Sequence, residues 1–210
     1  MNIFHISAEC YPVAKAGGLG DVVGALPKYL NKTGHNATVV LPHYHNKWLQ
    51  DAETEILFEG RAPIGTGSFV YRVSRLIEPD LGFELILIDI PGRFDRPGVY
   101  LDPWSGHPYW DEKERIFSFQ IAAMEWLLEL TDKPDIVHCH DHHTALVPFM
   151  MAHSFRYSLL RTIPTALTIH NGEYQGRYDI GSASLLPEFD PGKYGLLEWD
   201  GQLNAFATGI

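Results

Sequence analysis

Cysteine is scarce in this chain, which has only Cys10 and Cys139 among its 210 residues. So few thiols exclude a framework of several disulfides and are typical of a protein from a reducing compartment. The chain has no stretch of about 18 consecutive apolar residues, and residues 1–6 lack the basic and apolar regions of a secretory signal. We therefore expect a cytoplasmic protein with no membrane partner.

Basic residues are outnumbered, because 16 lysines and arginines stand against 26 acidic residues and the net charge is -10. A nucleic-acid-binding surface needs a basic stripe that neutralises phosphates, so we expect no nucleic-acid partner. A small anionic ligand is compatible with this charge, because one local cation and a few oriented backbone N–H groups are enough to hold it.

Linkers and internal repeats are also absent, and 45% of the residues are hydrophobic. Residues 1–210 are therefore expected to form one domain that needs no structural metal. Strands are expected at residues 2–8, 37–41, 56–58, 68–77, 84–90, 136–139 and 165–169. Helices are expected at 19–30, 116–130 and 144–153 and from 203 onward, with a long loop at 91–111.

Within the first predicted helix, Pro27 should kink or shorten the helix, and Gly34 should end it. The alternation of strands and helices predicts an α/β fold, namely a Rossmann-like, doubly wound and mainly parallel sheet with helices on both faces. Ligands of such sheets bind at the carboxyl ends of the strands. Three of these ends carry polar sequence, at residues 9–20, 138–143 and 170–176.

The first of these ends holds a glycine-rich loop at residues 15–20, just before the first predicted helix. Backbone N–H groups and the helix dipole favour an anion there, and Lys15 adds a positive charge. The loop matches neither the P-loop nor the dinucleotide-binding pattern, so ATP hydrolysis and a nicotinamide cofactor are not indicated. The alternative interpretation is a plain tight turn.

The second end, from His138 to His143, has four histidines and Asp141 within six residues. This composition suggests a transition-metal site and, with it, a zinc or iron hydrolase. The metallohydrolase pattern HxHxDH, however, needs aspartate at the position of His142, and here the aspartate is one residue early. The alternative is that Asp141 or Thr144 caps the following helix while the histidines are exposed or satisfied by neighbours.

The third end, at residues 170–176, offers donors and acceptors that suit sugar hydroxyls, although His170 alone could be structural. Tyr100, after a turn at residues 95–98, could either cover the core or line a cleft. Aromatic faces for sugar stacking would instead make the chain a glycan-binding module without catalysis. The tryptophans available for this role are Trp48, Trp104, Trp110 and Trp126.

Residues 15–27, which read KAGGLGDVVGALP, closely resemble the KxGGL block of bacterial glycogen synthases and plant starch synthases, glycosyltransferase family 5. Further blocks follow in the order of that family, at residues 95–98, 140–143, 170–171, 174–176 and 201–204. The resemblance covers essentially the whole chain. The chain departs from the family pattern at three places, with His142 in place of tryptophan, Gly172 and Glu173 in place of a more apolar pair, and Ala207 in place of a lysine.

The resemblance implies that residues 1–210 are the N-terminal Rossmann-like half of a GT-B glycosyltransferase whose C-terminal nucleotide-binding domain lies outside this chain. It implies transfer of glucose from ADP-glucose to the non-reducing end of an α-1,4-glucan such as glycogen, with retention of configuration. Neither a metal nor an organic cofactor is implied. The fragment alone is expected to be inactive.

The resemblance also implies roles for individual residues. Lys15 would contact the donor's diphosphate, which Gly17 and Gly18 would allow to approach the backbone, and Asp21 would support this loop. His170 and Asp141 would be the catalytic residues beside the reacting glucose. The remaining candidates would line the donor or acceptor cleft, namely Glu9, Asn171, Tyr100 and His143.

Overall fold

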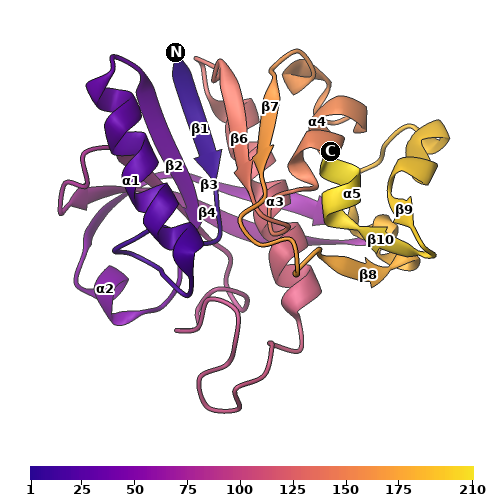
Figure 1. Cartoon of the computed structure of the whole chain (residues 1–210), viewed down its shortest axis with the longest axis horizontal. Helices are drawn as coiled ribbons and strands as arrows, with labels where there is room; N and C mark the ends of the chain where they lie inside the picture. Colours follow the sequence, from indigo (N-terminus) through magenta and orange to yellow (C-terminus); the bar gives the residue numbers. More distant parts are fainter.

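The computed structural model describes all residues from Met1 to Ile210. Its central sheet has seven strands in the order β3-β4-β5-β2-β1-β6-β7 (Figure 1). Five of them are parallel, namely β5 (Glu84–Asp89), β2 (Asn36–Pro42), β1 (Asn2–Ile6), β6 (Ile136–His140) and β7 (Thr165–Thr168). β2 and β5 are mostly apolar, as is typical of parallel strands covered on both faces, whereas β1 and β6 also carry histidines.

Helices connect the parallel strands in two opposite directions across the sheet. α1 (Gly18–Lys32) leads from β1 to β2, whereas α3 (Glu112–Glu129) leads from β5 across the sheet to β6. Since such crossovers are right-handed, α1 and α3 cover opposite faces. α4 (Val147–His153) joins β6 to β7 in the same direction as α3. The predicted doubly wound fold is confirmed, and the direction of the connections changes between β1 and β6.

Pro27 was expected to kink or shorten α1, and the shortening is wrong, because the helix continues to Lys32. Proline has no N–H for the carbonyl of Val23, four residues earlier, and that carbonyl accepts instead from the thiol of Cys10 at 3.8 Å. Gly34 follows the helix with a positive φ of 86°, where it ends the helix as predicted.

The middle of the chain forms a long hairpin where the sequence predicted shorter strands. β3 (Glu53–Ile64) and β4 (Gly67–Glu78) pair antiparallel, and β4 pairs antiparallel with β5. The predicted strand at 56–58 is therefore only the middle of β3. Between β2 and this hairpin lies the short helix α2 (Lys47–Gln50). The loop predicted at 91–111 hangs below the carboxyl ends of the parallel strands (Figure 1).

A second sheet of three short strands was missed by the sequence analysis. It has the order β8-β10-β9, with β8 (Arg177–Asp179), β9 (Glu198–Trp199) and β10 (Gln202–Asn204). Asp200 and Gly201 both have positive φ values, of 56° and 76°, as a two-residue hairpin turn requires. The final helix, α5 (Ala205–Gly209), begins after β10, so the helix expected from residue 203 starts two residues late. Three 3-10 helices complete the fold, at Ser158–Leu160, Ile180–Leu185 and Pro191–Leu196.

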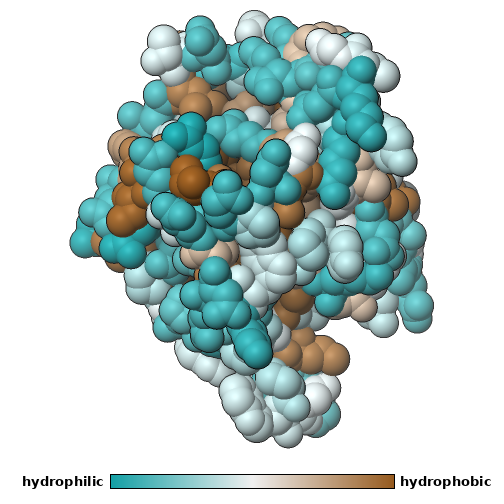
Figure 2. Space-filling view, turned by 90° about the vertical axis from the view of Figure 1, so that its left-hand side faces the viewer, coloured by the Kyte–Doolittle hydropathy of each residue, from teal (hydrophilic) through white to brown (hydrophobic).

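The side of the molecule that carries α1 and α2 is mostly hydrophilic, with small separate hydrophobic patches (Figure 2). None of the helices combines the length and the apolar character needed to cross a bilayer.

The packing of α1 depends on Gly24, because a Cβ at this position would lie 2.4 Å from the backbone oxygen of Tyr11. We predict that Gly24→Ala lowers the free energy of unfolding by about 1–3 kcal/mol, the usual cost of overpacking. Helix propensity alone would give the opposite sign, a gain of about 1 kcal/mol. Urea unfolding measures the difference, with Gly195→Ala as control because a Cβ there meets nothing within 4 Å. A stabilised Gly24→Ala variant would contradict the observed packing.

Candidate functional site

The predicted site residues gather at one edge of the sheet, where β1, β6 and β7 end. β6 lies between β1 and β7, so the segments that follow these three strands are neighbours. The edge coincides with the place where the connections change direction, which is where doubly wound sheets bind their ligands.

Glu9 holds three parts of this edge together and is only 2% exposed. Its Oε2 accepts hydrogen bonds from the backbone N–H groups of Ala16 and Gly17, at 2.6 and 2.7 Å. Its Oε1 accepts from the hydroxyl of Tyr100 at 2.7 Å. Glu9 was predicted to line the cleft, whereas its carboxylate is turned to the protein and sets the position of the glycine-rich loop.

Burial, and next the charge of Glu9, raise the pKa of Tyr100 far above its ordinary value. The hydroxyl of Tyr100 therefore stays protonated and donates to Glu9.

Lys15 and Asp21 form an ion pair on the surface of the loop. The ammonium of Lys15 donates to both carboxylate oxygens of Asp21 at 2.7 Å, and both side chains are exposed, by 42% and 56%. Such an exposed pair contributes little to stability, so it leaves Lys15 available to a stronger anion. Asp21 therefore contacts Lys15, and its role in supporting the loop stays a prediction.

The first turn of α1 is open to an anion. Gly17 is the N-cap of α1, and no side chain caps the helix. A Cβ on Gly18 would meet nothing within 4 Å, so the space beside this residue is free. Gly18 is therefore the position of this helix end that a ligand can reach, because the N–H of Gly17 already donates to Glu9 and the next two residues are buried.

Asp141 ties the end of β6 to the end of β7. Its Oδ1 accepts from the backbone N–H groups of His170 at 2.7 Å and Asn171 at 3.3 Å, whereas Oδ2 has no hydrogen-bond partner in the protein. The residue has a positive φ of 59°, which is uncommon for aspartate. Oδ2 is thus the carboxylate oxygen that remains for a ligand.

The alternative that Asp141 or Thr144 caps the following helix is wrong. α4 begins only at Val147, and its N-cap residue, Leu146, makes no side-chain cap. The hydroxyl of Thr144 instead accepts from the backbone N–H of His140 at 2.7 Å. The positions of both side chains are therefore set by the strand ends rather than by the helix.

Of the two alternatives for the histidines at residues 138–143, exposure is wrong for most of them, because His140, His142 and His143 are buried. The other alternative, that they are satisfied by neighbours, holds for His138 and His140. Burial lowers the pKa of His142 to about 4, and it lowers the pKa of His140 and His143 well below the usual value. These imidazoles are therefore neutral at pH 7.

A possible ligand set for a metal differs from the predicted cluster, because it consists of His5, His138 and His140, with ligand atoms within 4.8 Å of one another. Much of this set is already paired. His5 Nδ1 lies 3.1 Å from His140 Nε2, and His138 Nε2 lies 2.7 Å from Thr168 Oγ1. The expectation that the protein holds no metal stays a prediction.

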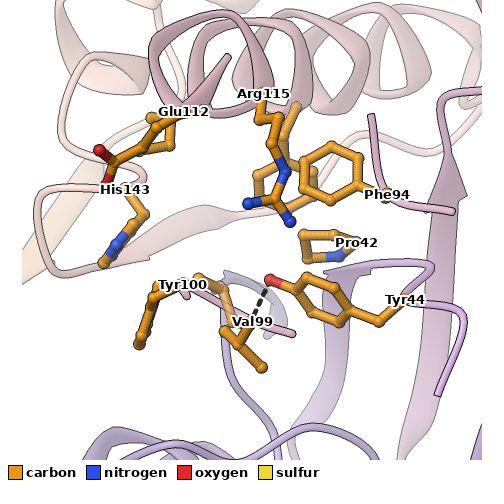
Figure 3. A pocket seen from close by; sticks show the side chains of 11 residues that line it. Pro42, Tyr44, Phe94, Val99, Tyr100, Glu112, Arg115 and His143 are labelled. Atoms are coloured by element: carbon orange, nitrogen blue, oxygen red, sulfur yellow. Dashed lines mark hydrogen bonds between the residues drawn. The ribbon is translucent and has the colours of Figure 1, made fainter. Parts of the chain in front are cut away.

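Tyr100 and His143 stack with ring centroids 4.6 Å apart and an angle of 19° between the rings. They line a cavity of about 20 Å³, into which Arg115 reaches from α3 (Figure 3). A volume of this size holds about one water molecule. A larger hollow of about 290 Å³ lies by β4 and the end of β5 and includes none of the predicted site residues. Neither of these two hollows therefore offers an enclosed pocket for a ligand larger than water at the predicted site residues.

The sequence profile of the starch synthase catalytic domain matches residues 2–210. The chain belongs to the starch synthase catalytic domain family. It is 44% identical to a glycogen synthase of Flavobacterium johnsoniae over 100% of this chain and 43% of that protein. It is 37% identical to a glycogen synthase of Streptococcus gordonii, again over 100% of this chain and 43% of that protein.

A solved structure from the same family is also similar. The catalytic domain of starch synthase IV from Arabidopsis thaliana, bound to ADP and acarbose, matches with a TM-score of 0.80 and 27% identity. The match covers 98% of this chain and 42% of that one. The chain thus spans less than half the length of the relatives that it matches.

In this member of the starch synthase family, sequence reasoning missed His5 and Arg115. Arg115 is 3% exposed and donates to the backbone oxygen of Arg93 at 2.8 Å, which helps to hold the long loop that carries Tyr100. His5 could have been found, because it pairs with His138 on the neighbouring strand, and His140 lies two residues further on the same face. Arg115 had no such signal in the sequence.

The buried histidines of this family member predict a loss of stability in mild acid. The pKa values of His5 and His142 are lowered to about 4, chiefly by burial, whereas in the unfolded chain they return to 6.5. Between these values the unfolded state binds a proton that the folded state excludes. Each histidine therefore lowers the free energy of unfolding by about 1.4 kcal/mol per pH unit as the pH falls from about 6.5 to 4.

Urea unfolding at pH 7, 6 and 5 measures how the free energy of unfolding changes with pH. The variant His142→Gln should reduce this slope by the contribution of about one proton, which is about 1.4 kcal/mol per pH unit. The difference between the two slopes isolates His142 from all other titrating groups. Parallel slopes for the variant and the unmodified protein would contradict the buried neutral state of this side chain.

Proposed function

We propose that the chain is the N-terminal domain of a glycogen synthase and that a C-terminal nucleotide-binding domain completes the GT-B fold. The enzyme would transfer glucose from ADP-glucose to the non-reducing end of an α-1,4-glucan, with retention of configuration and without a cofactor. Support comes from the glycogen synthases among the relatives and from the neighbour whose structure contains ADP and acarbose. The free and buried thiols of Cys10 and Cys139 support a cytoplasmic protein.

The observation that carries the proposal is the open first turn of α1 beside Lys15, on the same sheet edge as His170. A nucleoside diphosphate gains negative charge as it leaves glucose, and preorganised N–H donors and a lysine stabilise that charge most in the transition state. Lys15 would exchange Asp21 for the diphosphate. His170, Asn171 and Oδ2 of Asp141 would then orient the sugar hydroxyls.

No side chain at this edge is placed as a covalent nucleophile in our proposal. We infer a displacement on one face of the sugar, in which an oxygen of the departing phosphate takes the proton of the acceptor hydroxyl. The new glycosidic bond then forms on the face from which the phosphate leaves, which retains the configuration. The task of the protein is to position both substrates and to stabilise charge.

The direct test counts radiolabelled glucose that the full-length gene product transfers from ADP-glucose to glycogen. We expect rapid incorporation by the full-length protein, slower incorporation from UDP-glucose, and none by residues 1–210 alone. A full-length protein that transfers glucose from neither donor would overturn the proposal.

Replacing Lys15 by glutamine removes the charge and keeps most of the side-chain length. A charge-assisted contact contributes about 1.5–3 kcal/mol, so kcat/KM for ADP-glucose should fall about tenfold to a hundredfold. Lys32→Gln at the other end of α1 is the matched control and should leave kcat/KM unchanged. Equal donor kinetics for Lys15→Gln and the unmodified enzyme would remove Lys15 from the donor site.

A second candidate function, glycan binding, is favoured by two exposed tryptophans. Trp104 is 82% and Trp110 is 90% exposed, and both lie in the long loop below the strand ends. Trp126 and Trp48 pack instead against the hydrophobic core, so their faces are not free for a sugar. The loop can therefore offer two aromatic faces to a glucan chain.

Calorimetric titration of residues 1–210 with maltoheptaose, without nucleotide-sugar, tests this function. Stacking contributes about 0.5–1.5 kcal/mol per ring, so a Trp104→Ala and Trp110→Ala double variant should bind about tenfold more weakly. Trp199, which is 61% exposed on β9, supplies the control variant Trp199→Ala. If residues 1–210 bind no maltoheptaose, the glycan-binding function fails.

A further inference from the structure

Three imidazoles form a hydrogen-bonded row that leads from the core of the sheet to the candidate site. His5 Nδ1 lies 3.1 Å from His140 Nε2, and His140 Nδ1 lies 3.0 Å from His170 Nε2. His5 and His140 are 0% exposed, whereas His170 is partly exposed at the end of β7. The rings follow one another at small angles, of 25° and 22°.

The number of protons in this row is fixed by its geometry. Each of the two N···N contacts needs one proton between its nitrogens, and a neutral imidazole carries one proton in total. His5 and His140 are fully buried, and burial disfavours the charged form of an imidazole, so each of these two rings carries one proton. All three rings therefore point their N–H groups either toward His5 or toward His170.

The inner end of the row decides between these two directions. His5 Nε2 is fully buried and has no hydrogen-bond partner. If the N–H groups pointed toward His5, this nitrogen would carry a proton, and a buried N–H without an acceptor is rare in proteins. In the opposite direction, His5 Nε2 is a bare nitrogen, and each N–H in the row except the last has an acceptor.

No neighbouring side chain forms a hydrogen bond with the row that would favour one of the two directions. His138 packs against His140, with ring centroids 4.1 Å apart, but its Nε2 is paired with Thr168 Oγ1. The backbone N–H of His140 donates to Thr144 Oγ1 and not to a ring. The row is therefore set by its own three members.

We propose that His140, with His5 behind it, is a positioning residue that holds His170 as the tautomer with its proton on Nδ1. His5 donates from Nδ1 to His140 Nε2, and His140 donates from Nδ1 to His170 Nε2. No side chain or backbone group of this chain accepts from His170 Nδ1, so its N–H is free for a ligand oxygen.

This inference deepens the proposed function, on which its functional part rests. His170 would meet the sugar hydroxyls or the leaving phosphate as a hydrogen-bond donor and would not act as a base. A donor of fixed direction stabilises an oxygen that gains negative charge, as the leaving phosphate does.

The tautomer is measured directly by nitrogen NMR of the full-length gene product with ¹⁵N-labelled histidine, and the variant His170→Gln assigns the signals. We expect a protonated Nδ1 and an unprotonated Nε2 for His170 at pH 7.5. A proton on Nε2, or one that is averaged between both nitrogens, would overturn the proposal.

Two variants of His140 separate positioning from packing. The amide of asparagine reaches the place of Nδ1, so His140→Asn keeps a donor to His170. The amide of glutamine reaches the place of Nε2, so His140→Gln keeps only the contact with His5. We expect the Nδ1 proton of His170 to persist in His140→Asn and to be lost in His140→Gln, with kcat/KM lower by about tenfold in the latter.

The thermal midpoint of unfolding is measured for each variant, so that a loss of stability can be distinguished from a loss of positioning. His107→Asn, in the exposed loop, is the control for the substitution itself. Equal losses of kcat/KM and the same tautomer in both variants would overturn the positioning role. If a variant does not fold, the spectrum of the unmodified protein still decides the tautomer. A protein with the expected tautomer but no glucose transfer would support the row and overturn only the proposed function.

Discussion

The carboxylate of Glu9 is the constraint on which the candidate site depends. It is buried directly after β1, and burying such a charge is costly unless several donors compensate for it. Here the donors come from two separate segments, the backbone at Ala16 and Gly17 and the hydroxyl of Tyr100. One side chain therefore fixes the glycine-rich loop, and with it Lys15 and the start of α1, relative to the long loop that crosses below the sheet.

Asp141 has the same function on the neighbouring strand, where it binds the backbone at His170 and Asn171. The two carboxylates stand at the ends of β1 and β6, between which the direction of the connections changes. Because both carboxylates bind the backbone of neighbouring loops, the edge is ordered without an enclosed pocket. His170 and the start of α1 lie on the frame that these carboxylates hold, and a second domain would supply the opposite wall in the proposed enzyme.

The parallel strands, the two main helices and the family could be predicted from the sequence, because apolar periodicity and the block at 15–27 are local signals. The roles of individual residues within the site could be predicted less well from the sequence. Glu9, predicted in the cleft, accepts from residues up to 91 positions away, and no local pattern reveals such a contact. The continuation of α1 past Pro27 could not be predicted, because the donor that compensates for the missing N–H, the thiol of Cys10, lies in the preceding loop. Asp200 and Gly201 are a local hairpin signal from which β9 and β10 could have been predicted.

The central claim, that Glu9 joins the two loops, is tested most directly by a double-mutant cycle between Glu9→Ala and Tyr100→Phe. The quantity to measure is kcat/KM for ADP-glucose in the full-length enzyme. A hydrogen bond to a buried carboxylate predicts that Tyr100→Phe costs about 1.5–3 kcal/mol when Glu9 is present and nothing when it is absent. The same cost in both backgrounds would contradict the claim, because Tyr100 would then act independently of Glu9.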